Sequence, residues 1–137
     1  MESNKYYKPE IKEFNVGFEY ERNQYQNGVW YKYVVEERDI LDHNEKEIRV
    51  KYLDKKDIEE ILEVKQLKGN KSELNFQLII NDNLFYEIDY DVDTKELVVE
   101  KYVEVYEDTY NSYTLFKGIV KNKSKLKTVL KDIRIIN

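Results

Sequence analysis

The chain has 137 residues, of which 37% are charged, and a formal net charge of −5 at pH 7. This length suffices to bury one hydrophobic core and is short for two cores of comfortable size, so we predict a single domain over residues 1–137. The absence of cysteine excludes disulfides and thiolate metal sites. No stretch approaches the ~20 apolar residues of a membrane span, and the first residues lack the apolar run of a signal peptide. We therefore predict a soluble, cytoplasmic protein without a membrane partner.

The charge is unevenly distributed along the chain. Residues 117–137 contain seven Lys or Arg and one Asp, whereas residues 1–116 carry a net charge of −11. This pattern predicts an acidic body with a basic C-terminal segment.

The N-terminal third is rich in aromatic residues. Residues 1–9 are polar and end at Pro9, which disfavours a preceding helix, so we expect a flexible leader. Apolar and polar residues then alternate from Phe14 to Tyr20, which predicts a first strand. Asn27-Gly28 is a strong hairpin signal, and the β-branched and aromatic residues from Val29 to Glu36 predict the second strand.

The next segment predicts a strand followed by a short helix. Glu37 to Glu45 fits either one helical turn or a loop, and alternation over residues 48–52 predicts another strand. Asp54 then fits a helix N-cap, because its carboxylate accepts hydrogen bonds from free backbone N–H groups, and Asp57 completes a variant of the capping box. We expect this helix to end near Glu63 and a turn to follow at Gly69-Asn70.

The strongest pattern is a two-residue period between Glu73 and Tyr106. It predicts two antiparallel strands joined at Asn81–Asn83, with one set of apolar residues on a single face. This set consists of Leu74, Phe76, Leu78, Ile80, Leu84, Tyr86, Ile88, Tyr90 and Val92. After a reversal over residues 93–96 we expect a third strand, with its apolar face formed by Leu97, Val99, Val103 and Val105.

The C-terminal part predicts a loop, a strand and a helix. Residues 107–112 favour a loop, and Thr114 to Val120 favour a last strand. Asn122 or Ser124 begins a final helix, which is expected to pack on the sheet through Leu126, Val129, Leu130 and Ile133. The predicted fold class is α+β, with a mostly antiparallel sheet of about six strands and two short helices packed on one face.

One segment has the spacing of a calcium loop. Positions 1, 3, 5 and 12 of an EF-hand loop carry carboxylates, as do Asp89, Asp91, Asp93 and Glu100. Thr94, however, occupies the place of the required glycine, and the flanks alternate like strands. Because alternate residues of one strand point to the same side, a strand edge gives the same spacing. We predict no metal site and keep these four residues as a weak candidate.

No residue set of an enzyme stands out. His43 is the only histidine, so neither a zinc site nor a catalytic triad can be assembled in the usual way. No spacing selects an opposed carboxylate pair of the glycosidase kind, and none of the isolated glycines opens a phosphate-binding loop. We predict a non-enzymatic protein without a cofactor.

Two charged surfaces are candidate binding sites. The final helix carries basic residues on the side away from its apolar face, at Lys123, Lys127, Lys131 and Arg134. This stripe fits nucleic-acid phosphates, although a helix that shows its lysines to water has the same pattern. The segment from Glu87 to Asp108 is acidic, with Lys95 and Lys101 interrupting it. It fits the basic groove of a nucleic-acid enzyme, with Glu100 and Glu104 as candidate binding residues.

Three segments support a resemblance: Glu13–Glu21 (EFNVGFEYE), Ile48–Leu62 (IRVKYLDKKDIEEIL) and Phe116–Leu130 (FKGIVKNKSKLKTVL). They are similar to segments of short uncharacterised proteins carried by bacteriophages and prophages. The chain departs from that pattern at Glu63-Val64, where a Gly-Phe pair is usual. The resemblance implies a phage accessory protein and implies no activity.

We therefore expect a non-enzymatic phage or prophage accessory protein that binds a host macromolecule. The most concrete version is an inhibitor of a defence nuclease such as an RNA-guided (CRISPR) effector, with the host enzyme or its RNA complex as partner. Two alternatives remain: a small virion or assembly component, and an RNA- or DNA-binding protein that uses the basic C-terminal helix.

Overall fold

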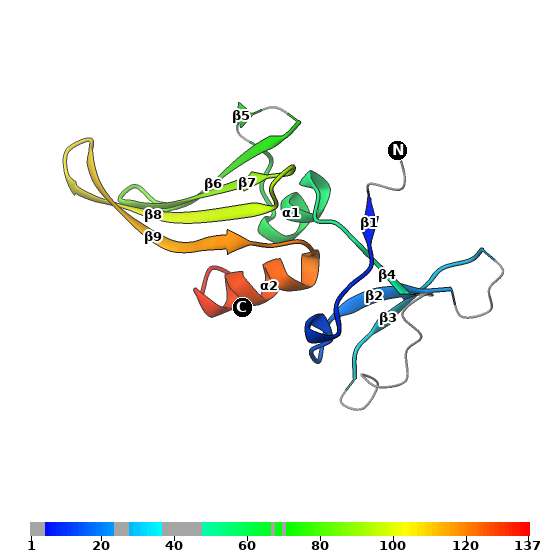
Figure 1. Cartoon of the computed structure of the whole chain (residues 1–137). Helices are drawn as coiled ribbons and strands as arrows, with labels where there is room; N and C mark the ends of the chain where they lie inside the picture. The colour runs from blue at the N-terminus through cyan, green and yellow to red at the C-terminus, as the bar shows by residue number, and fades with distance from the viewer. Residues whose placement is uncertain (1–4, 24–27, 37–47, 67, 70) are drawn as a thin grey trace. The chain divides into compact units, whose positions relative to one another are not determined.

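The computed structural model describes residues 5–23, 28–36, 48–66, 68–69 and 71–137 (Figure 1). Contacts between Cα atoms divide the chain into two compact units. Unit 1 comprises Met1–Tyr52 and Asn122–Lys125, and unit 2 comprises Leu53–Lys121 and Leu126–Asn137. That residues 1–137 form a single domain stays a prediction.

Unit 1 contains an antiparallel sheet in the order β1-β4-β2-β3. Its elements are β1 (Tyr6–Tyr7), the 3-10 helix η2 (Ile11–Glu13), β2 (Glu19–Arg22), β3 (Tyr31–Val34) and β4 (Ile48–Lys51). A small core forms from the buried side chains of Phe14, Phe18, Tyr20, Val35, Ile48 and Val50. The strand predicted over residues 48–52 is confirmed.

Two N-terminal predictions need correction. Tyr6 and Tyr7 pair with Lys51 and Val50, so this part of the expected leader is a strand instead. The strand predicted from Phe14 begins only at Glu19, because η2 precedes it and Gly17 takes a left-handed φ of 91°. Residues 1–4, Asn27 and the segment 37–47, which includes His43, lie outside the described residues.

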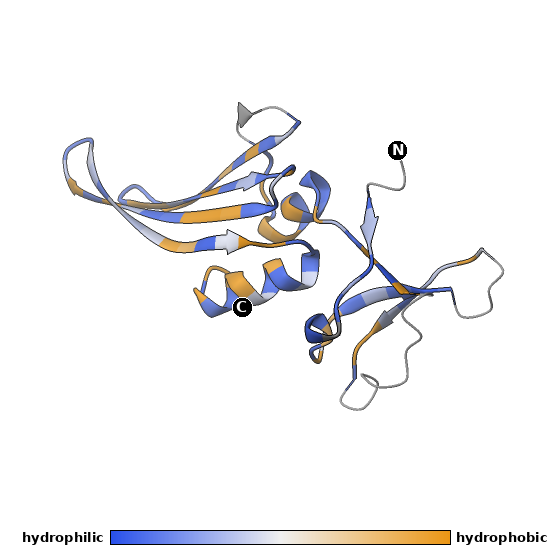
Figure 2. Ribbon diagram, in the orientation of Figure 1, coloured by the Kyte–Doolittle hydropathy of each residue, from blue (hydrophilic) through white to orange (hydrophobic). Residues whose placement is uncertain are grey.

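Unit 2 contains an antiparallel sheet in the order β5-β6-β7-β8-β9. Its strands are β5 (Lys68–Gly69), β6 (Glu73–Asn81), β7 (Leu84–Asp91), β8 (Glu96–Tyr106) and β9 (Thr109–Ile119). The predicted hairpin and third strand are confirmed, and Asn83 N–H donates to the Asn81 side chain at the tip (2.8 Å). Figure 2 shows apolar residues concentrated on the central strands of this sheet and on the helix below them, α2 (Lys123–Asp132).

Both helices pack on one face of this sheet, as predicted. Helix α1 (Lys55–Leu62) is capped by Asp54, whose Oδ1 accepts from Asp57 N–H at 2.9 Å. Helix α2 (Lys123–Asp132) begins after Asn122, whose Oδ1 accepts from Lys125 N–H at 2.8 Å. The shared core consists of Leu53, Ile58, Leu62, Leu74, Phe76, Ile88, Tyr90, Leu97, Val99, Val120, Leu126, Val129 and Leu130.

The α+β class is therefore confirmed, but the strands form a four-stranded and a five-stranded sheet rather than one sheet of about six. The predicted loop over residues 107–112 is also wrong, since only Glu107 and Asp108 lie between β8 and β9. Ile80 and Val105 are exposed (51% and 55%) because bulges interrupt the alternation at both places. Gly69 lies in β5, and Asn70 is outside the described residues.

Within the described residues, no helix has the length and apolar character needed to cross a membrane.

Candidate functional site

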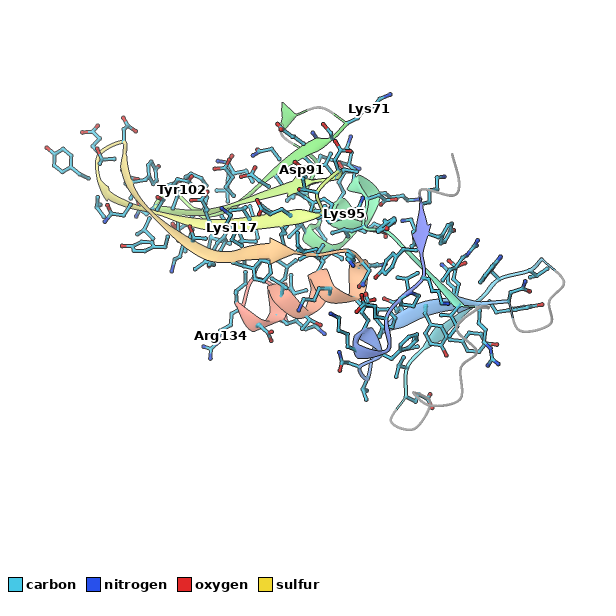
Figure 3. All side chains as sticks on the ribbon, viewed as in Figure 1. Lys71, Asp91, Lys95, Tyr102, Lys117 and Arg134 are labelled. Atoms are coloured by element: carbon cyan, nitrogen blue, oxygen red, sulfur yellow. The ribbon has the colours of Figure 1, made fainter. Side chains whose placement is uncertain are left out.

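The five-stranded sheet has one face that the helices do not cover, and most of its acidic residues lie there. Cross-strand partners share a face, and the partners include Glu73 with Asp91 and Glu87 with Glu100. We call this surface the acidic face, and its residues include Glu73, Asn75, Phe85, Glu87, Asp89, Asp91, Glu96, Glu100, Tyr102, Glu104 and Tyr110. Figure 3 labels Asp91 and Tyr102 on this sheet.

The two lysines that interrupt the acidic run in the sequence do not lie on this face. Lys101 lies opposite Tyr86, on the face that bears the helices. Lys95 lies in the turn before β8, where its Nζ donates to the Val92 carbonyl oxygen. Lys117, opposite Val98, is the only basic residue that β6, β7, β8 and β9 place on the acidic face. Over these four strands the face is therefore more uniformly acidic than the sequence indicates.

Three carboxylates crowd together at its centre. Asn75 Nδ2 donates to Glu87 Oε1 at 2.9 Å and to Asp89 Oδ1. Glu87 lies directly opposite Glu100 on the next strand. Burial raises the pKa of Asp89, and the negative charges of Glu87 and Glu100 add to this effect, while the bond from Asn75 opposes it. Like charges placed opposite each other destabilise a sheet, so this cluster lowers the stability of the fold.

This crowding predicts how stability depends on pH. Because the folded pKa of Asp89 lies above its unfolded value, the folded state binds the proton more tightly between the two values. The free energy of unfolding contributed by this group therefore falls as the pH rises through that interval. Asp89→Asn removes this loss and is expected to stabilise the protein at about pH 7, with a gain that shrinks toward about pH 4. Urea unfolding at both pH values measures the gain, and an equal gain at both would contradict an origin in ionisation.

An aromatic cluster adjoins the carboxylates. The rings of Phe85 and Tyr102 are stacked with centroids 4.8 Å apart, and Tyr110 meets Phe85 edge-on at 5.4 Å. Desolvation raises the pKa of Tyr102, as do the charges of Glu87 and Glu100. Its hydroxyl therefore stays protonated at neutral pH. The sequence analysis missed this cluster, although Phe85 and Tyr102 are aromatic at positions where the alternation requires polar residues.

The acidic face is hollowed at one end. An open depression of about 480 Å³ is lined by Glu73, Leu74, Asn75, Asp89, Tyr90, Asp91, Glu96 and Val98. Carboxylates from three neighbouring strands therefore surround it, which suits a positively charged side chain of a partner.

The weak calcium candidate is not assembled as a loop. Asp91 Oδ1 accepts from the N–H groups of Asp93 and Thr94 at 2.9 and 3.0 Å, so this carboxylate closes the turn. Strands β7 and β8 flank the segment where an EF-hand requires helices. In the part of the chain that the structure describes, no group of three or more His, Asp or Glu could hold a metal ion.

The basic stripe is shorter than the sequence predicts. Lys123, Lys127 and Lys131 lie on α2, and of these Lys131 is exposed while the other two are half-buried. Arg134 lies beyond the helix, which ends at Asp132, and takes a left-handed φ of 63°. The prediction that Arg134 continues the helical spacing of the three lysines is therefore wrong. Figure 3 labels Arg134 at this end of the chain.

We compared the chain with protein-family models, with curated proteins and with solved structures, and none of them matches it. The resemblance to phage and prophage proteins stays a prediction. The function is therefore inferred from the surfaces of unit 2.

Proposed function

We propose that this chain is a non-enzymatic protein whose acidic face binds a basic, nucleic-acid-binding surface of a host protein. The observation that carries the proposal is the crowding of Glu87, Asp89 and Glu100 on the sheet face that the two described helices leave open. The arrangement works against stability, and such local conflicts are typical of functional sites.

The geometry of the face supports a macromolecular partner. Carboxylates two residues apart on one strand are separated by about 6.7 Å, and neighbouring strands by about 4.8 Å, so the charges form a regular array. Arginine and lysine side chains that bind the negative phosphates of a nucleic acid would also be attracted to this array, because its carboxylates are negative too. The stacked Phe85 and Tyr102 add apolar area and rings over which a guanidinium can lie. A nucleic-acid-binding surface offers both kinds of contact.

The class of partner follows from the phage-like segments. For a phage accessory protein, an enzyme that must bind nucleic acid in order to act against the phage is a natural target. We therefore propose a defence nuclease, such as an RNA-guided effector or its RNA complex, as the partner. In this function the acidic face competes with nucleic acid for a basic groove.

Charge reversal on the acidic face tests the proposal. Glu100→Lys combined with Glu104→Lys is expected to weaken inhibition of a susceptible nuclease by roughly 100-fold, because two favourable charges become repulsive. The measurement is cleavage of target DNA by purified bacterial RNA-guided nucleases at increasing concentrations of the chain. The matched control, Glu63→Lys with Asp132→Lys, makes the same change in net charge on exposed residues outside the acidic face.

Misfolding is not expected to cause such a loss. Glu100→Lys places a positive charge opposite Glu87 and is expected to stabilise the sheet by about 0.5 kcal/mol, and Glu104→Lys removes an exposed hydrogen bond of 3.4 Å from Asp108 N–H. Urea unfolding checks that point. Equal inhibition by the acidic-face variant and the parent chain would overturn the proposal, as would the absence of inhibition across the nucleases tested.

Nucleic-acid binding through α2 is the second candidate, and the exposure of Lys131 favours it. A gel shift that disappears in the Lys123→Ala, Lys127→Ala, Lys131→Ala variant would support this function. The role of a virion or assembly component stays a further alternative.

A further inference from the structure

The outer edge of β9 differs from most edge strands. β9 is the last strand of its sheet, and no described strand pairs with that edge. It is 11 residues long, and alternate residues direct their backbone N–H and C=O groups outward. Natural edges are usually short or carry charges along their length, which prevents pairing with another chain. Lys117 is the only charged residue within β9.

The charges at the two ends of β9 have opposite signs. Glu107 and Asp108, both exposed, lie in the turn immediately before the strand, and exposed Lys117 lies near its far end. Between them, residues 109–116 carry no charge. Figure 3 labels Lys117 on this strand.

We propose that β9 pairs with β9 of a second copy of this chain, antiparallel and around a two-fold axis near Ser112. In that arrangement the start of each strand lies beside the end of the other. Glu107 and Asp108 of each copy then approach Lys117 of its partner, and no like charges meet at the centre. The strand is thus complementary to itself in both backbone hydrogen bonding and charge.

The side chains of β9 also fit pairing with a second copy of the chain. Tyr110 and Tyr113 lie on either side of Ser112 and are 38% and 51% exposed, and pairing would cover part of both rings. The bulge at Leu115, between the partners of Val99 and Glu100, limits regular pairing about Ser112 to residues 110–114, and the charged residues lie just outside this stretch. A contact of this length is expected to give a weak, concentration-dependent dimer.

Self-pairing has a consequence for the acidic face. A two-fold axis perpendicular to the sheet places the acidic faces of both copies on the same side of one continuous sheet. Two such faces would engage a repeated or extended basic surface with avidity that a single copy lacks.

Sedimentation equilibrium of the full chain over a wide concentration range tests this proposal. We expect a reversible dimer that Lys117→Glu weakens by roughly tenfold, because like charges then meet at both ends of the paired strands. Glu107→Lys should weaken it to a similar extent, and the double variant Glu107→Lys, Lys117→Glu should restore it. Lys71→Glu is the matched control, because Lys71 is an exposed lysine beside β6, at the other side of the sheet.

A chain that stays monomeric up to about 1 mM overturns the proposal. A dimer that both single variants leave unchanged, or that the double variant fails to restore, overturns this interface. These outcomes are separate from the nuclease assay, since Glu107 and Lys117 are not the residues reversed there.

Discussion

Phe76→Ala is expected to lower the free energy of unfolding of unit 2 by about 3–5 kcal/mol. The ring of Phe76 is fully buried, in a core to which both helices and the central strands contribute. Its removal takes away the transfer free energy of the ring and leaves a cavity that the surrounding strands cannot close. Since small domains are stable by about 5–15 kcal/mol, this loss would leave a substantial unfolded population under mild denaturing conditions.

Ile79→Ala provides the matched control, because Ile79 lies on the same strand but is 68% exposed. Its expected cost is within about 0.5 kcal/mol. Urea unfolding, followed by circular dichroism, measures both variants. Similar losses at the two positions would show that the sheet does not have one buried and one open face, and the acidic face would lose its structural basis.

Asn122→Ala is expected to cost about 2–3 kcal/mol. Asn122 is buried, with 5% of its surface exposed, and its side-chain amide makes two hydrogen bonds. Oδ1 caps α2 by accepting from Lys125 N–H, and Nδ2 donates to the Tyr7 hydroxyl at 2.8 Å. Burial and the neighbouring Glu13 carboxylate raise the pKa of Tyr7, so its hydroxyl stays protonated and donates to Glu13 Oε1 at 2.7 Å.

Asn122→Asp separates the contributions of these two hydrogen bonds to stability. Aspartate keeps an acceptor for the helix N-terminus, where negative charge is favourable, but it offers no donor to Tyr7. We expect roughly half of the loss seen with alanine. If aspartate cost as much as alanine in thermal or urea unfolding, the capping bond would contribute no more than the cost of burying a carboxylate beside the Tyr7 hydroxyl and Glu13.

The elements that could be predicted are those whose signal is local. The alternation from Glu73 to Tyr106, the Asp54 cap and the apolar stripe of α2 each depend on residues close in sequence, and the structure confirms all three. Predictions failed where local signals conflicted. Phe14 to Tyr20 alternates like a strand, yet Gly17 turns the chain there, so only the last part is extended. Asn111 and Ser112 favour a loop by composition, but pairing with β8 holds them in β9.

The candidate site could be predicted only in part. Glu100 and Glu104 do lie on one acidic surface, as expected. The sequence could not show that Lys101 points to the opposite face, or that Glu73 and Asn75 of β6 join the carboxylates of β7, because both depend on strand register. The aromatic cluster of Phe85, Tyr102 and Tyr110 likewise comes from three different strands.

The sequence by itself determined the α+β class, the central meander and the two capped helices, since side-chain period and capping chemistry act over a few residues. Tertiary structure alone decided that the strands divide between two sheets, and which charges meet on one open face. The physical reason is that pairing between strands depends on backbone hydrogen bonds and on burial across long stretches of chain, and neither leaves a local pattern.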